Sequence, residues 1–196
     1  MIVNRVAECY DGKGSILPLL AVRAVIVHRT DLKLLTPNNP HPIPDALLDG
    51  PGLCRAFMAH DLGTGRRPPY HVLIRQDGIA EQCLPLSIAG AHCVGRNHQS
   101  LAVAVVGDFR HILPSAAQWD ALVWVVAQWM PINGGLDTVG HSEIPNGSHD
   151  PNKICPGRHI NVRQVEIEAL RSLPQGWRLW SPEGCAAELA GAEWVL

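Results

Sequence analysis

Two histidines and one cysteine, His28, His141 and Cys155, have the residue types and the sequence context of a metal site. His28 ends the apolar run 21–27, so a core strand would hold its side chain in a fixed direction. His141 follows a second strand-like stretch, 136–140. Two imidazoles and a thiolate make three protein ligands, and three ligands with one open position form the arrangement of catalytic zinc. The pattern therefore predicts a zinc site that performs hydrolysis.

Residues near Cys155 leave other chemistries open. His149, Asp150 and His159 lie close to it in the sequence and are alternative ligands, although a polar segment of this kind is typical of a solvated loop. A fourth protein ligand, His149 or His159, would make the zinc structural rather than catalytic. Cys155 could also serve as a nucleophile with a histidine as its base, in which case chelators would not inhibit the enzyme.

The elements that must hold these residues predict an α/β fold. Asp77-Gly78 is favoured in a tight hairpin turn, and strand-like runs flank it. Ser115 precedes Gln118 by the spacing of a capping box, which predicts a helix ending near Pro131. Strands interleaved with helices indicate a single domain with a central mixed β-sheet flanked by helices. The expected strands are 21–28, 72–75, 79–82, 101–106 and 136–140, and the expected helices are 52–61, 115–130 and 161–173.

The overall composition bounds the domain organisation and the partners. A chain of 196 residues with 46% hydrophobic and 17% charged residues should form one folded domain, expected over 1–173. The tail 174–196 carries Trp177, Trp180 and Trp194, which we expect to pack on that domain. The net charge is -2 and the longest basic run is Arg66-Arg67, so we expect no nucleic-acid partner.

The compartment is also predicted from the sequence. The most apolar stretch, 16–27, contains Pro18 and Arg23, so it fits neither a secretory signal nor a membrane span. We therefore expect synthesis in the cytoplasm without a signal peptide and no membrane insertion. The six cysteines follow no pattern, which favours reduced thiols. A monomer is expected.

Six short blocks stand in order along the chain and carry a family resemblance. They are 25–30 (VIVHRT), 70–78 (YHVLIRQDG), 90–97 (GAHCVGRN), 100–107 (SLAVAVVG), 140–144 (GHSEI) and 155–157 (CPG). Together they resemble the type 2 N-acetylmuramoyl-L-alanine amidases, which include amidase-type phage endolysins and the peptidoglycan recognition proteins. The resemblance spans about 22–173. It implies that His28, His141 and Cys155 bind Zn²⁺ and that the enzyme hydrolyses the amide between N-acetylmuramic acid and L-alanine of peptidoglycan or a muropeptide.

The resemblance also assigns catalytic roles to two further residues. Tyr70 and Lys153 match the positions of the catalytic tyrosine and lysine of the amidase-type endolysins. A cation close to the ligand Cys155 is well placed to stabilise a tetrahedral oxyanion. The Tyr70 hydroxyl could donate to that oxyanion or orient the attacking water. From the residues alone, Tyr70 would be a packing aromatic and Lys153 a solvated charge.

Three other residues are candidates at the edge of the site. His92 and Asn97 lie in the block that borders the substrate groove of the family, although Asn97 is also typical of turns. Glu143 is either an alternative base or a residue that orients His141.

One departure from part of the family favours a lytic role. The cytoplasmic wall-recycling amidases carry a glutamate where this chain has Ala104, and an aspartate in place of Cys155. The chain therefore resembles the endolysin and recognition-protein branch more closely. We expect a phage or prophage endolysin that acts on the cell wall after release. A wall-recycling amidase and a non-catalytic peptidoglycan-binding module are the alternatives.

Overall fold

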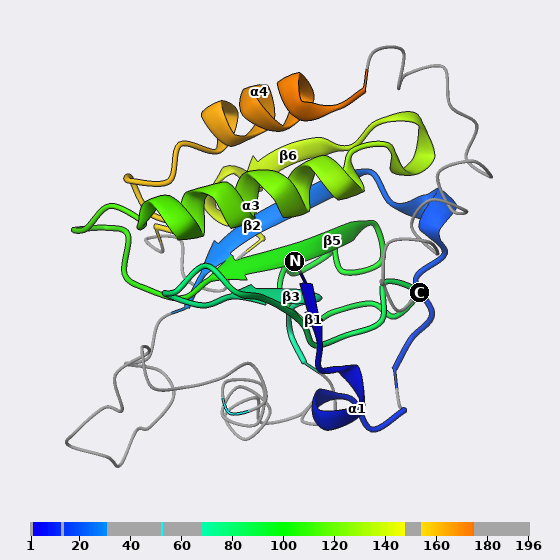
Figure 1. Ribbon diagram of the computed structural model, residues 1–196. Coiled ribbons are helices and arrows are strands. Elements are labelled where there is room, and N and C mark those ends of the chain that lie inside the picture. The colour runs from blue at the N-terminus through cyan, green and yellow to red at the C-terminus, as the bar shows by residue number, and fades with distance from the viewer. Residues whose placement is uncertain (1, 13, 31–51, 53–67, 148–153, 175–196) are drawn as a thin grey trace.

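The computed structural model describes residues 2–12, 14–30, 52, 68–147 and 154–174. Its centre is a six-stranded sheet in the order β1-β4-β3-β5-β2-β6, with two long helices over one face (Figure 1). The strands are β1 (Ile2–Asn4), β2 (Ala24–Arg29), β3 (Val72–Ile74), β4 (Ala80–Gln82), β5 (Ser100–Val105) and β6 (Asp137–Gly140). The helices are α1 (Val6–Cys9), α3 (Ala116–Trp129) and α4 (Val162–Ser172), with 3₁₀ turns η1 (Leu19–Ala21), η4 (Ile132–Gly134) and η5 (His141–Glu143).

The pairing of the strands confirms the predicted mixed sheet. β3 and β4 are antiparallel and form the expected hairpin, with Gly78 at a positive φ of 83° in its turn. β2 pairs in parallel with β5 and with β6, and β5 also pairs in parallel with β3. β5 is buried along its whole length, which explains its continuous apolar sequence. β1, which the sequence pattern did not reveal, pairs in parallel with β4 at the sheet edge.

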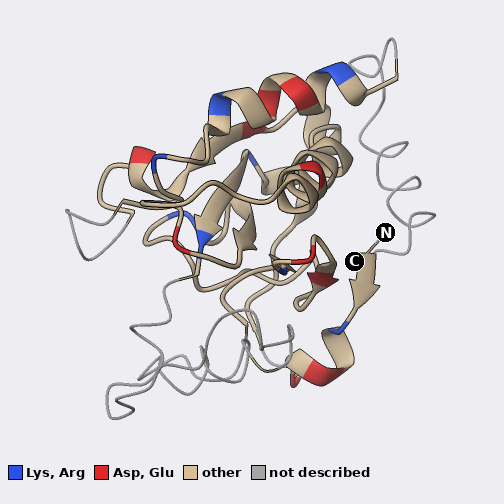
Figure 2. Ribbon diagram, turned by 60° about the vertical axis from the view of Figure 1, so that its left-hand side comes forward, with Lys and Arg blue, Asp and Glu red and all other residues tan. Residues whose placement is uncertain are grey.

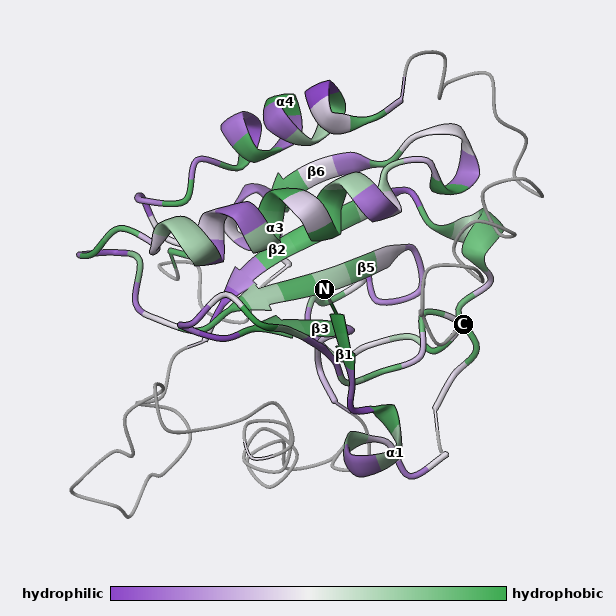
Figure 3. Ribbon diagram, in the orientation of Figure 1, coloured by the Kyte–Doolittle hydropathy of each residue, from purple (hydrophilic) through white to green (hydrophobic). Residues whose placement is uncertain are grey.

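Helices α3 and α4 cover one face of the sheet and form the main core with it. The capping box predicted at Ser115 is present, since its side chain accepts from the Gln118 amide and the Gln118 side chain accepts from the Ser115 amide. Trp119 of α3 donates to Glu168 of α4 at 2.7 Å. Figure 3 shows the apolar residues concentrated in the strands and the inner helix faces, while Figure 2 shows basic and acidic residues interspersed along α4.

Alternation along β2 divides its side chains between the two faces of the sheet. Val25 and Val27 belong to the core cluster that includes α3 residues. The intervening residues Ile26 and His28 therefore point to the opposite face, because successive side chains of a strand alternate. β2 lies between β5 and β6 and is hydrogen-bonded to both. The strand that carries His28 near its C-terminal end is therefore held on both sides.

The buried imidazole of His71 stabilises the sheet beside the hairpin. Its Nε2–H donates to the Ile88 carbonyl at 2.9 Å, and its Nδ1 accepts from the Ala102 amide at 3.0 Å. Burial lowers the pKa of His71 to about 4, against a smaller opposing effect of the hydrogen bond to Ile88. His71 is therefore a neutral hydrogen-bonding residue of the core.

We expect His71 to make the protein less stable in acid. Below the ordinary pKa of 6.5, the unfolded chain binds a proton that the folded chain does not take up until about pH 4. The free energy of unfolding should therefore fall as the pH drops from about 6.5 to about 4. When the free energy of unfolding is measured with denaturant across that pH range, it should fall less steeply with decreasing pH in His71→Gln than in the wild type. Equal slopes would contradict this role for His71.

Some predictions fall on residues outside the described ranges. They are the helix 52–61, apart from Gly52, and the packing of the tail beyond residue 174. Within the described ranges, none of the helices has the length and apolarity that a membrane crossing requires.

Candidate active site

The structure brings His28, His141 and Cys155 together. His28 lies at the end of β2, and His141 begins η5 directly after β6, the parallel neighbour of β2. Cys155 comes from the segment before α4 and reaches the same point. One ligand atom from each residue lies within 4.8 Å of the others, and all three side chains are buried. Because parallel strands end at the same edge of a sheet, β2 and β6 deliver the two imidazoles side by side.

Hydrogen bonds select which ring nitrogen of each histidine faces the centre of the group. Nε2 of His141 donates to the Gly147 carbonyl at 2.7 Å, so its Nδ1 carries the lone pair. Nδ1 of His28 lies 3.8 Å from the Cys155 sulfur, while its Nε2 lies 3.2 Å from Nδ1 of His92. Two neutral imidazoles and a thiolate, each with an outer hydrogen-bond partner, form a donor set that fits zinc.

The segment that carries Cys155 is held against η5 by two reciprocal hydrogen bonds. The Cys155 amide donates to the Ser142 hydroxyl at 2.5 Å, and the Ser142 amide donates to the Cys155 carbonyl at 2.9 Å. Gly157 has a positive φ of 112°, and a Cβ there would lie 2.5 Å from the backbone of Phe109. The Cys-Pro-Gly sequence therefore permits a close turn that a larger residue at 157 would prevent.

Tyr70 lies half-buried beside the donor group formed by His28, His141 and Cys155. Its ring centroid is 5.0 Å from that of His28. Burial raises the pKa of Tyr70 well above its ordinary value, the nearby Cys155 raises it further, and Arg29 acts in the opposite direction. The Tyr70 hydroxyl therefore keeps its proton at neutral pH and can donate a hydrogen bond.

The other candidate residues take different positions around the group. His92 is buried and contacts His28 rather than standing apart in a groove. Asn97 shapes its own loop, since its Oδ1 accepts from the amides of His92 and Cys93 at 3.0 and 2.9 Å. Glu143 accepts from the Gly140 amide at 2.6 Å, which fixes the turn between β6 and η5.

The remaining candidates lie outside the described residues or outside the donor group. Lys153, His149 and Asp150 fall outside the described residues. His159, the other alternative ligand, is not part of the described donor group, and its amide donates to the Phe109 carbonyl.

Two residues close to the group were not anticipated from the sequence. Ser142 holds the Cys155 segment through the two hydrogen bonds between these residues. Arg29 follows His28 and places a buried guanidinium beside the same segment. The only sequence signal for Arg29 is a charged residue at the end of an apolar run, which is also the usual appearance of a strand that reaches solvent.

A cavity of ≈ 240 Å³ is lined by residues of β2, β6 and the segment that follows η5. Ile26 lines it two positions before His28, and Glu143 lines it two positions after His141. The cavity therefore lies beside β2 and β6, and none of His28, His141 and Cys155 is among its lining residues.

Comparisons with known proteins agree on one family. The family model for N-acetylmuramoyl-L-alanine amidase matches residues 18–158. A peptidoglycan-recognition protein of Drosophila simulans is 28% identical over 171 residues, which cover 84% of this chain and 79% of that protein.

Solved structures share the fold. The Ph2119 endolysin from a Thermus scotoductus bacteriophage has a TM-score of 0.59 at 24% identity, over 86% of this chain and 99% of its own. The endolysin amidase LysCS from Clostridium intestinale has a TM-score of 0.60 at 16% sequence identity, over 86% of this chain and 94% of its own. Drosophila PGRP-LB has a TM-score of 0.58 at 19% sequence identity, over 85% of this chain and 92% of its own. The family match spans both histidines and the cysteine of the donor group, and the chain belongs to the N-acetylmuramoyl-L-alanine amidase family.

Proposed function

We propose that this chain is a zinc-dependent amidase that hydrolyses the bond between N-acetylmuramic acid and the L-alanine of peptidoglycan stem peptides. The observation that carries the proposal is the convergence of His28, His141 and Cys155 within 4.8 Å in a buried site. Zinc hydrolysis needs neutral imidazoles and a thiolate held in a fixed geometry, and this group supplies them. The family match and the endolysin neighbours support the amidase reaction.

The three ligands would hold Zn²⁺, and the rest of the site would act on the substrate. A zinc ion bound there would polarise the scissile carbonyl and activate a water molecule for attack. Hydrolysis breaks the amide C–N bond, adds the water hydroxyl to the lactyl carbonyl carbon and leaves a proton on the alanine nitrogen. The Tyr70 hydroxyl, protonated beside His28, can donate a hydrogen bond to the oxygen on which negative charge develops.

A lysine just before the cysteine ligand has a separate role in this proposal. Lys153 supplies a positive charge for the same oxyanion without binding the metal. We expect Lys153→Ala to retain zinc and to lose at least about tenfold in kcat, since one oxyanion donor contributes that much or more. Zinc content and initial rates should be measured together, with Arg163→Ala on the exposed side of α4 as control. Near-wild-type turnover in Lys153→Ala would show that the charge has no such role.

Cleavage of a defined soluble muropeptide tests the reaction itself. The protein should convert a disaccharide-peptide into a free disaccharide with a lactyl carboxylate and a peptide beginning with L-alanine, both identified by mass spectrometry. The same muropeptide titrated calorimetrically would report binding. Binding with no product over long incubation would overturn the amidase proposal.

Binding of the muropeptide without any product would correspond to the alternative function, peptidoglycan binding without catalysis. The curated relatives are named as recognition proteins, and one solved neighbour, PGRP-LE, is in complex with tracheal cytotoxin, a monomeric peptidoglycan. The complete donor group and Tyr70 favour catalysis, because binding alone requires no metal ligands.

We further propose a lytic biological role, acting on intact cell wall after release. Two solved structures with this fold are named endolysins. The purified protein should clear a suspension of isolated cell walls. If it cleaves soluble muropeptides but leaves intact walls undegraded, the wall-recycling role is the correct one.

A further inference from the structure

Arg29 is a buried cation in direct contact with the segment that carries a metal ligand. Its side chain is 2% exposed. Nε donates to the Ile154 carbonyl at 3.0 Å, and the Arg29 amide donates to the Cys155 sulfur at 3.5 Å. Arg29 follows His28, and Ile154 precedes Cys155, so this one residue joins two ligands that lie far apart in the sequence.

An ion pair fixes the far end of the Arg29 side chain. Nη1 of Arg29 lies 3.2 Å from Oδ1 of Asp108. Arg110 donates to both oxygens of the same carboxylate, from Nε at 2.8 Å and from Nη2 at 2.5 Å. These bonds to Arg110, and to a lesser extent the charge of Arg29, hold the pKa of Asp108 well below its ordinary value. The carboxylate therefore stays charged, and Arg29 has a permanent partner.

The buried guanidinium of Arg29 needs partners, and this cluster supplies them. The Arg29 guanidinium reaches the carbonyl of Ile154, the residue before Cys155, and its ion-pair partner Asp108 is itself held by Arg110. A buried guanidinium is strongly unfavourable unless it is paired and hydrogen-bonded, and Asp108 and the Ile154 carbonyl supply partners for this one. The Ile154 side chain is 48% exposed, so packing of this side chain does little to hold the segment.

We propose that Arg29 is a positioning residue that sets the Cys155 sulfur in its metal-binding place before the metal arrives. The inference rests on the proposed zinc function. Nε of Arg29 fixes the main chain at Ile154, and the ion pair with Asp108 holds the guanidinium in the position from which it does so. Outer partners of metal ligands act in the same manner in other sites.

Zinc affinity, measured by competition with a chelator of known affinity, tests the proposal without any assay of hydrolysis. Arg29→Met should weaken zinc binding by about 10–100-fold, the range found when outer partners of ligands are removed. Arg29→Lys keeps the charge and should recover part of that loss. Asp108→Asn keeps Arg29 but weakens its ion pair, and should give a smaller loss in the same direction. With Co²⁺ as probe, the thiolate-to-metal absorption band should be weakest and most shifted in Arg29→Met and intermediate in Arg29→Lys, compared with the wild type.

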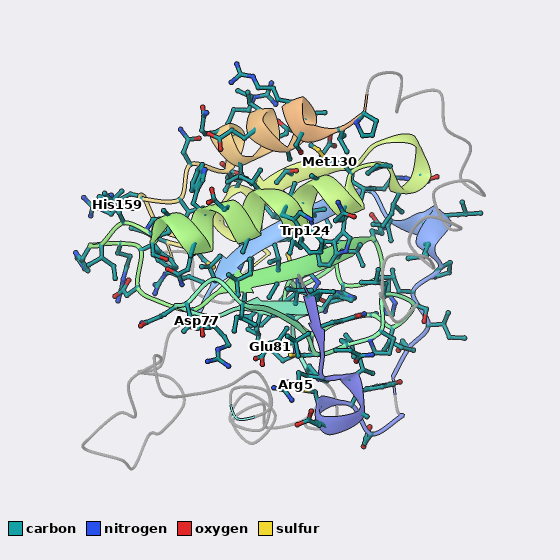
Figure 4. The ribbon with its side chains drawn as sticks, in the orientation of Figure 1. Arg5, Asp77, Glu81, Trp124, Met130 and His159 are labelled. Atoms are coloured by element: carbon teal, nitrogen blue, oxygen red, sulfur yellow. The ribbon has the colours of Figure 1, made fainter. Side chains whose placement is uncertain are left out.

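A matched control separates positioning from general stability. Arg5 forms an ion pair with buried Glu81 at 3.2 Å, at the β1–β4 edge of the sheet (Figure 4). Arg5→Met should lower the melting temperature while leaving zinc affinity and the Co²⁺ spectrum unchanged. If Arg29→Met fails to fold, Arg29→Lys and Asp108→Asn decide the matter.

The possible results separate the two proposals. Wild-type protein that does not bind zinc would overturn the proposed function. Wild-type protein that binds zinc, with folded Arg29 and Asp108 variants within about twofold of its affinity, would overturn the role of Arg29 alone.

Discussion

Replacing Cys155 with serine is expected to remove zinc binding and amidase activity together. The thiolate is the only anionic ligand of the described donor group, and a serine hydroxyl is a poor zinc ligand at neutral pH. Zinc contributes several kcal/mol of transition-state stabilisation, so activity should fall by more than about a thousandfold. Metal content by atomic absorption and initial rates on a muropeptide would be measured on the same preparations.

Two further variants serve as the control for Cys155→Ser and as a test of whether an anionic ligand is needed at position 155. Cys83 is also buried, and its sulfur donates to the Glu81 carbonyl, an interaction that a serine hydroxyl can replace. Cys83→Ser should therefore retain zinc and activity. Cys155→Asp restores an anionic ligand and should recover part of the zinc content and some turnover. A fully metal-loaded but inactive Cys155→Ser enzyme would indicate instead that Cys155 is a nucleophile.

The second large effect is expected from Tyr70→Phe. This change removes one hydroxyl from a half-buried ring beside His28 and leaves the metal ligands intact. If the hydroxyl donates to the developing oxyanion, kcat should fall by about 10²–10³-fold with little change in KM or zinc content. Because the pKa of Tyr70 is raised, ionisation of its hydroxyl should not limit activity in the neutral range.

The matched control is the other tyrosine of the chain, Tyr10, which follows α1. Tyr10→Phe should leave kcat unchanged. A Tyr70→Phe enzyme with wild-type kcat would mean that Tyr70 only packs against His28, and the oxyanion would have to be stabilised by other groups.

The central elements of the fold could be predicted from the sequence because their signals are local. Asp77-Gly78 specifies a hairpin turn, and the Ser115–Gln118 capping box specifies a helix start. β1 could not be predicted, because a strand of three residues, Ile2–Asn4, is too short to show alternation and, unlike the equally short β3 and β4, has no hairpin-turn signal beside it. Its position is set by pairing with β4, which lies far along the chain.

The candidate site divides in the same way. His28 and His141 follow apolar strand-like runs, so their direction could be anticipated, whereas their proximity depends on β2 pairing with β6. The contacts of Arg29 with Ile154, and of Ser142 with Cys155, join separate segments and leave no local pattern. The role of Glu143 also depends on a contact that the sequence pattern does not reveal. From the sequence it was either a catalytic base or a residue that orients His141, and in the structure its side chain accepts from the Gly140 amide.

The most direct test of the zinc amidase account is the release of new L-alanine amino termini from purified peptidoglycan, followed with and without a chelator and after zinc is added back. The account predicts release that the chelator abolishes and zinc restores. Absence of new alanine termini under every condition would contradict it and would leave peptidoglycan binding as the function. Release that persists in the chelator would point to a cysteine hydrolase.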